Sequence, residues 1–279
     1  MVLSLSGCQD SPAAPSTPAG PPQRIVSLSP TATEILFAIG AGSQVVAVDA
    51  DSTYPETAPR TGLSGFDPNT EALAGYRPDL VVYAIDPGEL GASLEAVGVR
   101  SLLQPPAARL EDTYDQILAL GAATGREREA GALVEEMKAG VTAAVGSLPR
   151  FERAPTYYHE LDQLYFTATS KTFIGEVYRL LGLDNIADEA DRQGNGYPRL
   201  SAEFIVQADP DFIFLADSRC CAQSAETVAS RPGWDQIRAV QNGGVIELDD
   251  DVASRWGPRI VELLASVADA VSSRPAVDR

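Results

Sequence analysis

The chain has 279 residues, 44% of them hydrophobic, which suffices for one large domain or for two lobes of ordinary size. Its formal net charge of -18 at pH 7 argues against a general role in binding nucleic acid or an anionic membrane surface by charge. The single histidine, His159, argues against a zinc site, because zinc proteins usually assemble two or three imidazoles around the metal.

The N-terminal residues predict a lipid anchor. Residues 5–8, Leu-Ser-Gly-Cys, fit the lipobox of bacterial lipoproteins, in which the cysteine thiol carries the lipid. Residues 9–23 contain five prolines among Ser, Ala, Thr and Gly, a composition typical of an extended tether. We therefore expect residues 1–23 to hold a domain just outside a membrane through Cys8. The alternative is a disordered tail with a chance cysteine.

Residues 24–108 alternate short apolar runs with helical stretches. The apolar runs are at residues 25–28, 45–48, 80–83 and 99–103, and the helical stretches are at 33–39 and 90–97. Buried strands separated by helices of about ten residues favour βαβ units and a parallel sheet covered on both faces. This segment is therefore predicted to form an α/β lobe.

Residues 109–149 differ in kind. Residues 110–148 contain no proline, and Leu133, Met137, Val141 and Val145 recur at the spacing of one helical face. This pattern predicts one long helix connecting two lobes, or two collinear helices with a break at Gly125.

The α/β pattern resumes in residues 150–279. Apolar runs at 156–159, 164–167, 212–215 and 245–248 predict strands, and helices are expected at 173–181 and 258–271. The predicted fold class is thus α/β, with two lobes that contain central parallel sheets and are joined by a single long helix.

An internal repeat supports two related lobes. Residues 69–82 and 201–214 each place a capping residue two positions before a glutamate, Glu71 or Glu203. In both copies Pro-Asp follows seven positions after the glutamate and introduces an apolar run. Two related lobes predict a cleft between them.

Several common motifs are missing from the sequence. Gly-x-Gly-x-x-Gly and Gly-Lys-Ser/Thr loops do not occur, which argues against binding of dinucleotides or nucleoside triphosphates. The adjacent Cys220 and Cys221 are a poor metal site, and they either fill space or form a strained ring in an oxidising compartment.

Two other classes of protein stay open from the residues alone. An α/β-hydrolase-like enzyme would use Ser64 with His159, or Glu160 and Asp162 as an acid–base pair. A structural surface lipoprotein would have a cleft closed by apolar side chains.

Several segments together resemble one family. Residues 24–40 (Arg-Ile-Val-Ser-Leu-Ser-Pro through Ile-Gly) and Tyr54-Pro55 resemble the opening of the helical-backbone class of ABC-importer substrate-binding proteins, which carry cobalamin, haem and ferric siderophores. The resemblance continues through residues 69–82, 165–176, 201–214, 231–234 and 255–261. Within the family the sequence is most similar to the vitamin B12 binders. The resemblance implies two Rossmann-like lobes joined by one rigid helix, a ligand in the cleft and modest hinge motion.

The resemblance also implies partners. Glu71 and Glu203 match the glutamates that dock with arginines on the two membrane subunits of the importer, and exposed carboxylates suit bidentate contacts with arginine. Alternatively, each merely stabilises a helix N-terminus, by roughly 0.3–1 kcal/mol. A monomeric, extracytoplasmic binding protein is expected, without enzymatic activity, cofactor or bound metal of its own, and held at the membrane only through the lipid on Cys8.

A corrinoid or haem-like ligand is broad and partly flat, so its pocket should offer aromatic faces and some amide or carboxylate partners. The predicted ligand-binding residues are Tyr54, Phe66, Tyr197 and Trp256, which match family positions near the ligand, with Tyr158, Glu160 and Arg255. For each aromatic residue the alternative is core packing. Arg199, Arg219 and Arg255 would instead suit the carboxylates of a siderophore. The resulting prediction is delivery of cobalamin or a related corrinoid to an ABC importer, with haem or a ferric siderophore as the alternative ligand.

Overall fold

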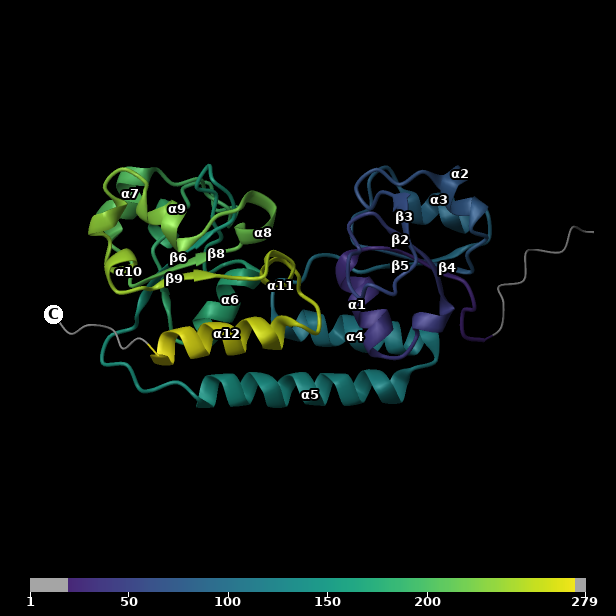
Figure 1. The fold of residues 1–279 in the computed structure, drawn as a ribbon. Coiled ribbons are helices and arrows are strands. Elements are labelled where there is room, and N and C mark those ends of the chain that lie inside the picture. The colour runs from purple at the N-terminus through teal and green to yellow at the C-terminus, as the bar shows by residue number, and fades with distance from the viewer. Residues whose placement is uncertain (1–19, 274–279) are drawn as a thin grey trace, which may run out of the picture.

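The computed structural model describes residues 20–273, in which two α/β lobes stand side by side above a layer of long helices (Figure 1). Cys8 and most of the predicted tether lie outside the described residues. Within residues 20–273, no helix is both long enough and apolar enough to cross a membrane.

The N-terminal lobe contains a five-stranded parallel sheet in the order β3-β2-β1-β4-β5. Its strands are β1 (Ile25–Leu28), β2 (Val45–Asp49), β3 (Arg60–Leu63), β4 (Leu80–Tyr83) and β5 (Arg100–Leu103). Its helices are α1 (Pro30–Ala38), α2 (Thr70–Gly75) and α3 (Leu90–Ala96), with a 3-10 turn at Gly42–Gln44. Every residue of β1 and β4 is buried, which explains why β4 is entirely apolar and why Ser27 is the single polar residue of β1.

The C-terminal lobe contains a four-stranded parallel sheet in the order β7-β6-β8-β9. Its strands are β6 (Thr156–Glu160), β7 (Asp184–Asn185), β8 (Phe212–Leu215) and β9 (Val245–Glu247). Its helices are α6 (Phe173–Leu180), α7 (Ala202–Ala208), α8 (Ser218–Cys221), α9 (Ala225–Ala229), α10 (Arg238–Gln241) and α11 (Asp250–Ser254), with 3-10 turns at Asp188–Ala190 and Trp234–Gln236.

The strand expected at residues 164–167 is wrong. This segment is a loop that pairs through an isolated antiparallel bridge between Phe166 and Arg199. Tyr165 has a φ of 67°, a left-handed conformation that a continuous strand does not contain. Its side chain stacks on Trp234 with ring centroids 5.7 Å apart, so tertiary packing has overridden the apolar sequence pattern.

The helical segment between the lobes is a hairpin. It forms α4 (Leu110–Thr124) and α5 (Glu127–Gly146), and the two helices lie against each other in antiparallel directions (Figure 1). Gly125 ends α4 with a φ of 71°, so the break falls where glycine allows it. The prediction of one continuous helix or two collinear helices over residues 109–149 is therefore wrong. One long helix does extend beneath both lobes, as predicted, but α5 alone forms it.

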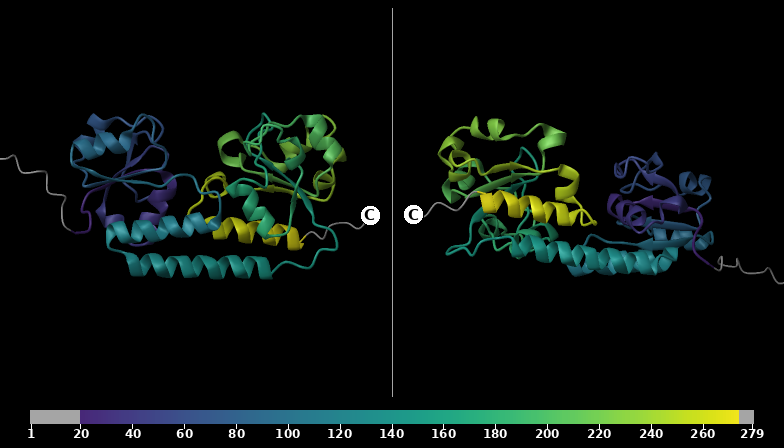
Figure 2. Two further views of the ribbon diagram at one scale, coloured as in Figure 1. Left: turned by 180° about the vertical axis from the view of Figure 1, so that it is seen from behind. Right: turned by 60° about the horizontal axis from the view of Figure 1, so that its bottom comes forward.

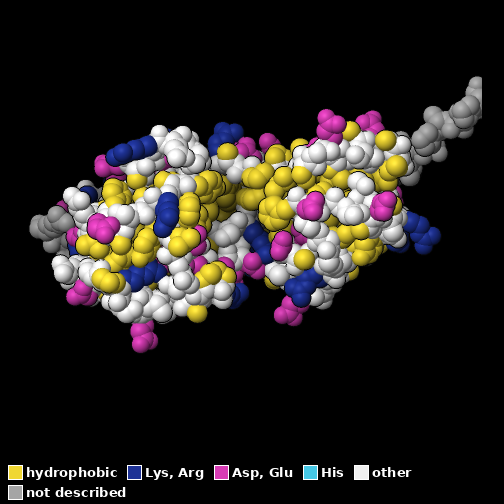
Figure 3. Space-filling view, turned by 90° about the horizontal axis from the view of Figure 1, so that it is seen from above, with side chains coloured by type: hydrophobic (Ala, Val, Ile, Leu, Met, Phe, Trp, Pro, Cys, Tyr) yellow, Lys and Arg dark blue, Asp and Glu magenta, His cyan; other side chains and the backbone are white. Residues whose placement is uncertain are grey.

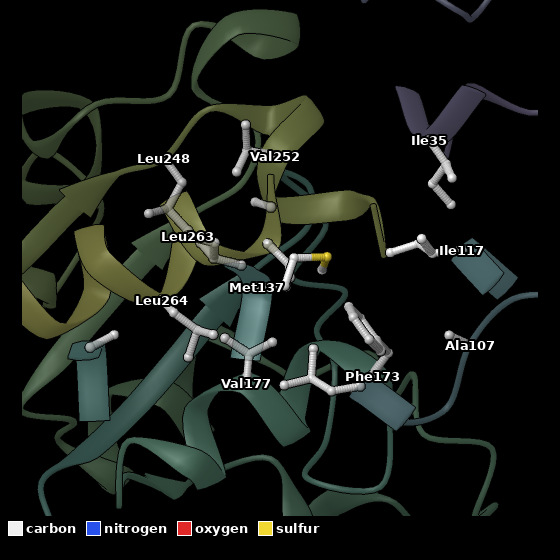
Figure 4. Packing of buried hydrophobic residues seen from close by; sticks show 14 of the residues in the cluster. Ile35, Ala107, Ile117, Met137, Phe173, Val177, Leu248, Val252, Leu263 and Leu264 are labelled. Atoms are coloured by element: carbon white, nitrogen blue, oxygen red, sulfur yellow. The ribbon is translucent and has the colours of Figure 1, made fainter. Parts of the chain in front are cut away.

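The C-terminal helix α12 (Ile260–Ser273) packs along α5, and both lie on one side of the molecule when it is seen from behind or from below (Figure 2). A single cluster of buried hydrophobic side chains includes residues of both lobes and of these helices. Met137 of α5 lies between Leu263 of α12 and Phe173 of α6, while Ile35 and Ile117 extend the cluster toward the N-terminal lobe (Figure 4). This shared core holds the two lobes together.

The internal repeat is confirmed in three dimensions. The Asn69 side chain accepts a hydrogen bond from the backbone of Ala72 at 2.9 Å, and the Ser201 hydroxyl accepts one from Phe204 at 3.2 Å. These caps begin α2 and α7, each of which leads into a buried strand, β4 or β8. Both helices lie on the face of the molecule opposite α5 (Figure 1).

Candidate functional site

A pocket of about 420 Å³ lies between the lobes. The carboxyl ends of β1, β2 and β4 supply one wall through Leu28, Asp49 and Ala84, and residues 254–256, at the end of α11 and just beyond it, supply another. Ligands of α/β proteins commonly bind outside the carboxyl ends of parallel strands. Seen from above, hydrophobic side chains gather on both lobes at either side of the waist (Figure 3). We call this the interlobe pocket.

Three of the predicted ligand-binding residues, Phe66, Arg255 and Trp256, line the interlobe pocket. The Phe66 side chain is 70% exposed, on a turn in which the Ser64 hydroxyl accepts hydrogen bonds from the backbone of Phe66 at 3.2 Å and Asp67 at 3.0 Å. Gly65 is required in this turn, because a Cβ atom there would collide with the carbonyl oxygen of Leu28. The turn therefore presents an aromatic ring to the pocket.

Tyr54 and Tyr197 are placed differently. Tyr54 lies beneath the Arg259 guanidinium, 4.1 Å from the ring centroid. Tyr197 lines a second pocket of about 210 Å³, together with the loop 194–196 and Ala107. Ala107 of this second pocket directly follows Pro106 of the interlobe pocket in the chain. Contacts of Tyr54 and Tyr197 with a ligand stay predictions.

The structure contradicts the predicted ligand contacts of Tyr158 and Glu160. Both residues are fully buried in β6, an inner strand of its sheet. Tyr158 packs edge-on against Trp234 with centroids 6.3 Å apart, and Glu160 accepts hydrogen bonds from both terminal nitrogens of Arg231, at 2.7 and 2.6 Å. The sequence does not show that Trp234 and Arg231, more than 70 residues away along the chain, pack against these two side chains.

The arginines considered for a siderophore have partners within the chain. Arg255 forms ion pairs with Glu34 at 2.9 Å and Asp251 at 2.7 Å, although it lines the pocket. Arg219 pairs with Asp249 at 2.7 Å, and Arg199 donates to the carbonyl oxygen of Leu164 at 2.9 Å. Their donors are therefore committed, at least in part, within the protein.

The residues considered for catalysis do not form a catalytic arrangement. His159 is fully buried in the C-terminal lobe, with Nδ1 2.8 Å from the Tyr178 hydroxyl, and burial lowers its pKa to about 3. Ser64, in contrast, lies in the N-terminal lobe. Glu160 is held by Arg231, while the Asp162 carboxylate accepts a hydrogen bond from the backbone of Leu164 at 2.8 Å. Neither proposed pair can therefore act as the hydrolase hypothesis requires.

The described residues contain no metal-binding cluster of three or more His, Cys, Asp or Glu side chains. Cys220 and Cys221 are free thiols. The pKa of Cys220 is raised to about 12, chiefly by its hydrogen bond with Cys221, so this thiol is protonated at neutral pH.

Glu71 and Glu203 are exposed in the first turns of α2 and α7. Hydrogen bonds from its own backbone and from Ser201 lower the pKa of Glu203, which keeps its carboxylate charged. The helices that carry them, α2 and α7, belong to separate lobes and lie on the face opposite α5 (Figure 1). Docking through them stays a prediction.

A second buried carboxylate lies near Glu160. Asp217 follows β8, is fully buried, and neither of its side-chain oxygens has a hydrogen-bond partner among the described residues. Burial, followed by the negative charge of Glu160, raises the pKa of Asp217 to about 7. The protonated form is therefore favoured in the folded protein.

We expect Asp217→Asn to stabilise the protein at pH 8 and to have little effect at pH 4. Because the folded protein binds this proton more tightly than the unfolded chain, stability falls as pH rises from 3.8 to about 7 and the loss is complete above that. The gain at pH 8 should be on the order of 2–4 kcal/mol. Urea unfolding at both pH values measures it, and an equal effect at both would contradict the assignment.

Comparison with known proteins identifies the family. Residues 25–252 match the sequence model of the periplasmic binding protein family. The chain is 30% identical over 261 residues to an uncharacterized ABC transporter substrate-binding lipoprotein, YvrC of Bacillus subtilis, covering 90% of this chain and 80% of that protein. It is 31% identical over 257 residues to a cobalamin-binding protein of Halobacterium salinarum, covering 89% of this chain and 69% of that protein.

Solved structures agree with this assignment. The periplasmic heme-binding protein RhuT of Roseiflexus sp. RS-1 superposes with a TM-score of 0.76 at 25% identity, covering 89% of this chain and 97% of that one. The chain therefore belongs to the periplasmic binding protein family. It is an extracytoplasmic substrate-binding protein of the helical-backbone, class III group that serves ABC importers, and not an enzyme.

Proposed function

We propose that the protein captures cobalamin or a related corrinoid in the interlobe pocket and delivers it to an ABC importer. The observation that carries this proposal is an apolar pocket at the strand ends between two lobes, flanked by the aromatic side chains of Phe66 and Trp256. Such faces suit a broad, partly flat ligand. The 31% identity to a cobalamin-binding protein supports the same ligand class.

The polar groups of the pocket favour a corrinoid over the alternatives. The only histidine of this chain is buried against Tyr178 and does not face the interlobe pocket, so it offers no ligand to a haem iron there. A corrinoid needs no histidine from the protein. Asp49 and Asp51 line the pocket, where carboxylates can accept hydrogen bonds from the amide side chains of a corrin ring. An anionic siderophore would be repelled by the carboxylates of Asp49 and Asp51. The charge of Arg255 does not offset this repulsion, because it is already paired with Glu34.

Calorimetric titration tests the ligand. Cyanocobalamin should bind with one equivalent per chain, whereas haemin and a ferric hydroxamate should bind more weakly. Haemin binding more tightly than cyanocobalamin would support the haem alternative suggested by the likeness to RhuT. Absence of a heat change with cyanocobalamin at about 10–100 μM, well above the Kd of a micromolar binder, would contradict the corrinoid assignment.

Phe66→Ala should weaken cyanocobalamin binding by about 2 kcal/mol, roughly a 30-fold rise in Kd, because an aromatic contact with the ligand is lost. The ring is 70% exposed in the free protein, so its loss should leave thermal stability unchanged. Val97→Ala is the matched control, since Val97 is 72% exposed at the end of α3. Equal affinities of both variants would exclude Phe66 from the site.

Two further parts of the proposal concern the membrane. We propose that Cys8 carries a lipid, an assignment supported by its lipobox sequence and by the lipoprotein name of YvrC. We also propose that Glu71 and Glu203 contact arginines of the importer's membrane subunits. Their exposure at equivalent positions of the two lobes supports this role.

A further inference from the structure

A buried carboxylate joins the two lobes beside the interlobe pocket. Glu34 of α1, in the N-terminal lobe, is 3% exposed. Arg259 donates to its two oxygens through Nε at 2.9 Å and Nη2 at 2.6 Å, and Arg255 donates through Nη1 at 2.9 Å. Both arginines follow α11, which comes from the sheet of the C-terminal lobe and lies between the lobes (Figure 1). We call Glu34, Arg255 and Arg259 the interlobe ion-pair cluster.

A second set of contacts surrounds this cluster. Nη2 of Arg255 donates to the carbonyl oxygen of Asp51 at 3.0 Å, to the Thr53 hydroxyl at 3.1 Å and to Asp251 at 2.7 Å. The Thr53 hydroxyl itself donates to Asp251 at 2.9 Å. These bonds connect segment 51–54 of the N-terminal lobe with segment 251–259, so lobe separation cannot change without breaking several of them.

The geometry of arginine makes this connection selective for one arrangement of the lobes. The bidentate contact of Arg259 requires both carboxylate oxygens in the plane of the guanidinium. A buried ion pair adds little net stability compared with apolar packing, yet removal of one partner leaves an uncompensated charge. The cluster therefore fixes relative position more than it stabilises the fold.

The cluster is also continuous with the pocket wall. Trp256 lies next to Arg255 in sequence, both line the interlobe pocket, and the indole Nε1 donates to Gln116 of α4 at 3.1 Å. Any shift of Arg255 relative to Glu34 would thus move a wall of the pocket.

We propose that Glu34 is a positioning residue, which sets lobe separation through Arg255 and Arg259 and so sets how firmly the pocket holds its ligand. Release to the importer then requires that these bonds be broken or strained. The statement about lobe separation stands on its own, whereas the statement about ligand release rests on the proposed function.

The test measures lobe separation without ligand. Spin labels at Glu95→Cys on α3 and Glu226→Cys on α9, both exposed, report the interlobe distance by pulsed electron paramagnetic resonance after Cys8, Cys220 and Cys221 are replaced by serine. Glu34→Gln keeps the side-chain shape and removes the charge. We expect its distance distribution to broaden or shift compared with the parent protein. An unchanged distribution would overturn the proposal.

Glu160→Gln is the matched control. Glu160 is an equally buried carboxylate with a bidentate arginine, but both partners lie in the C-terminal lobe. The Glu160→Gln variant should be less stable than the parent protein but should have the same distance distribution. An equal change of the distance distribution in both variants would show a general loss of structure and would refute a specific role of Glu34. If Glu34→Gln does not fold, Arg259→Lys, which keeps the charge and loses the second bond, should give the same broadening.

Ligand release gives the second measurement. Cyanocobalamin should dissociate about tenfold faster from Glu34→Gln than from the parent protein or Glu160→Gln. Unaltered dissociation together with a broadened distance distribution would refute the link to release and retain the positioning role. Absence of any cyanocobalamin binding to the parent protein would contradict the proposed function and leave the distance measurement as the test of Glu34.

Discussion

Replacement of both Glu71 and Glu203 by arginine is expected to abolish importer-dependent uptake and to leave ligand affinity in solution unchanged. Both carboxylates are exposed, on α2 and α7, outside the residues that line the interlobe pocket. If arginines of the importer receive them, each reversal replaces an attraction by a like-charge contact, which costs several kcal/mol at an interface. Two such contacts should reduce uptake by more than about 100-fold.

Uptake of labelled cyanocobalamin by cells that depend on this protein measures the effect, with calorimetry as the check on affinity. Glu136→Arg is the matched control, because Glu136 is an exposed glutamate on α5, on the opposite face of the molecule. It makes the same change in net charge per substitution and should leave uptake intact. Normal uptake by the double variant would show that the two glutamates only stabilise their helices.

Arg231→Met is expected to cause the largest loss of stability, about 3–5 kcal/mol at neutral pH. Arg231 pairs with the fully buried Glu160, and its guanidinium lies 4.5 Å from the Trp234 ring centroid. Methionine keeps the apolar packing but leaves Glu160 uncompensated, with Asp217 also buried nearby. A smaller loss at low pH is expected, because Asp217, whose pKa burial raises to about 7, is then protonated and adds no second negative charge beside Glu160.

Urea unfolding followed by circular dichroism measures this loss. Arg219→Met is the control, because Arg219 forms an ion pair with Asp249 while its side chain is 70% exposed. Such exposed pairs contribute about 0–1 kcal/mol. A loss for Arg231→Met no larger than that for Arg219→Met would contradict a structural role of the buried pair.

The sequence predicts strands well where both faces of a strand are buried. β4 and β8 are uninterrupted apolar runs, β1 is apolar except for Ser27, and all three occur where predicted. β3 was missed because its sequence Arg-Thr-Gly-Leu contains a single large apolar residue, as suits an edge strand. β7 has only two residues, Asp184 and Asn185, which carry no strand pattern.

The direction of the connecting helices was less predictable. Apolar residues at helical spacing show which face of a helix is buried, but the same stripe serves a straight helix and a hairpin. The break at Gly125 was visible in sequence, whereas the reversal of direction follows from packing of α4 against α5.

The site was predicted only in part. Phe66 and Trp256 could be placed through the family resemblance, and both line the interlobe pocket. Glu34 could not be connected with Arg255 and Arg259, because 221 and 225 residues separate these partners in sequence. A buried ion pair between distant segments leaves no local pattern, so it became visible only in the folded chain.

The claim that a corrinoid occupies the interlobe pocket is tested most directly by a crystal structure of the protein grown with cyanocobalamin. We expect one corrin ring between the lobes, in contact with Phe66 and Trp256, with the bonds from Arg255 and Arg259 to Glu34 retained. A ligand bound elsewhere on the surface, or an interlobe pocket without corrinoid at saturating concentration, would contradict it.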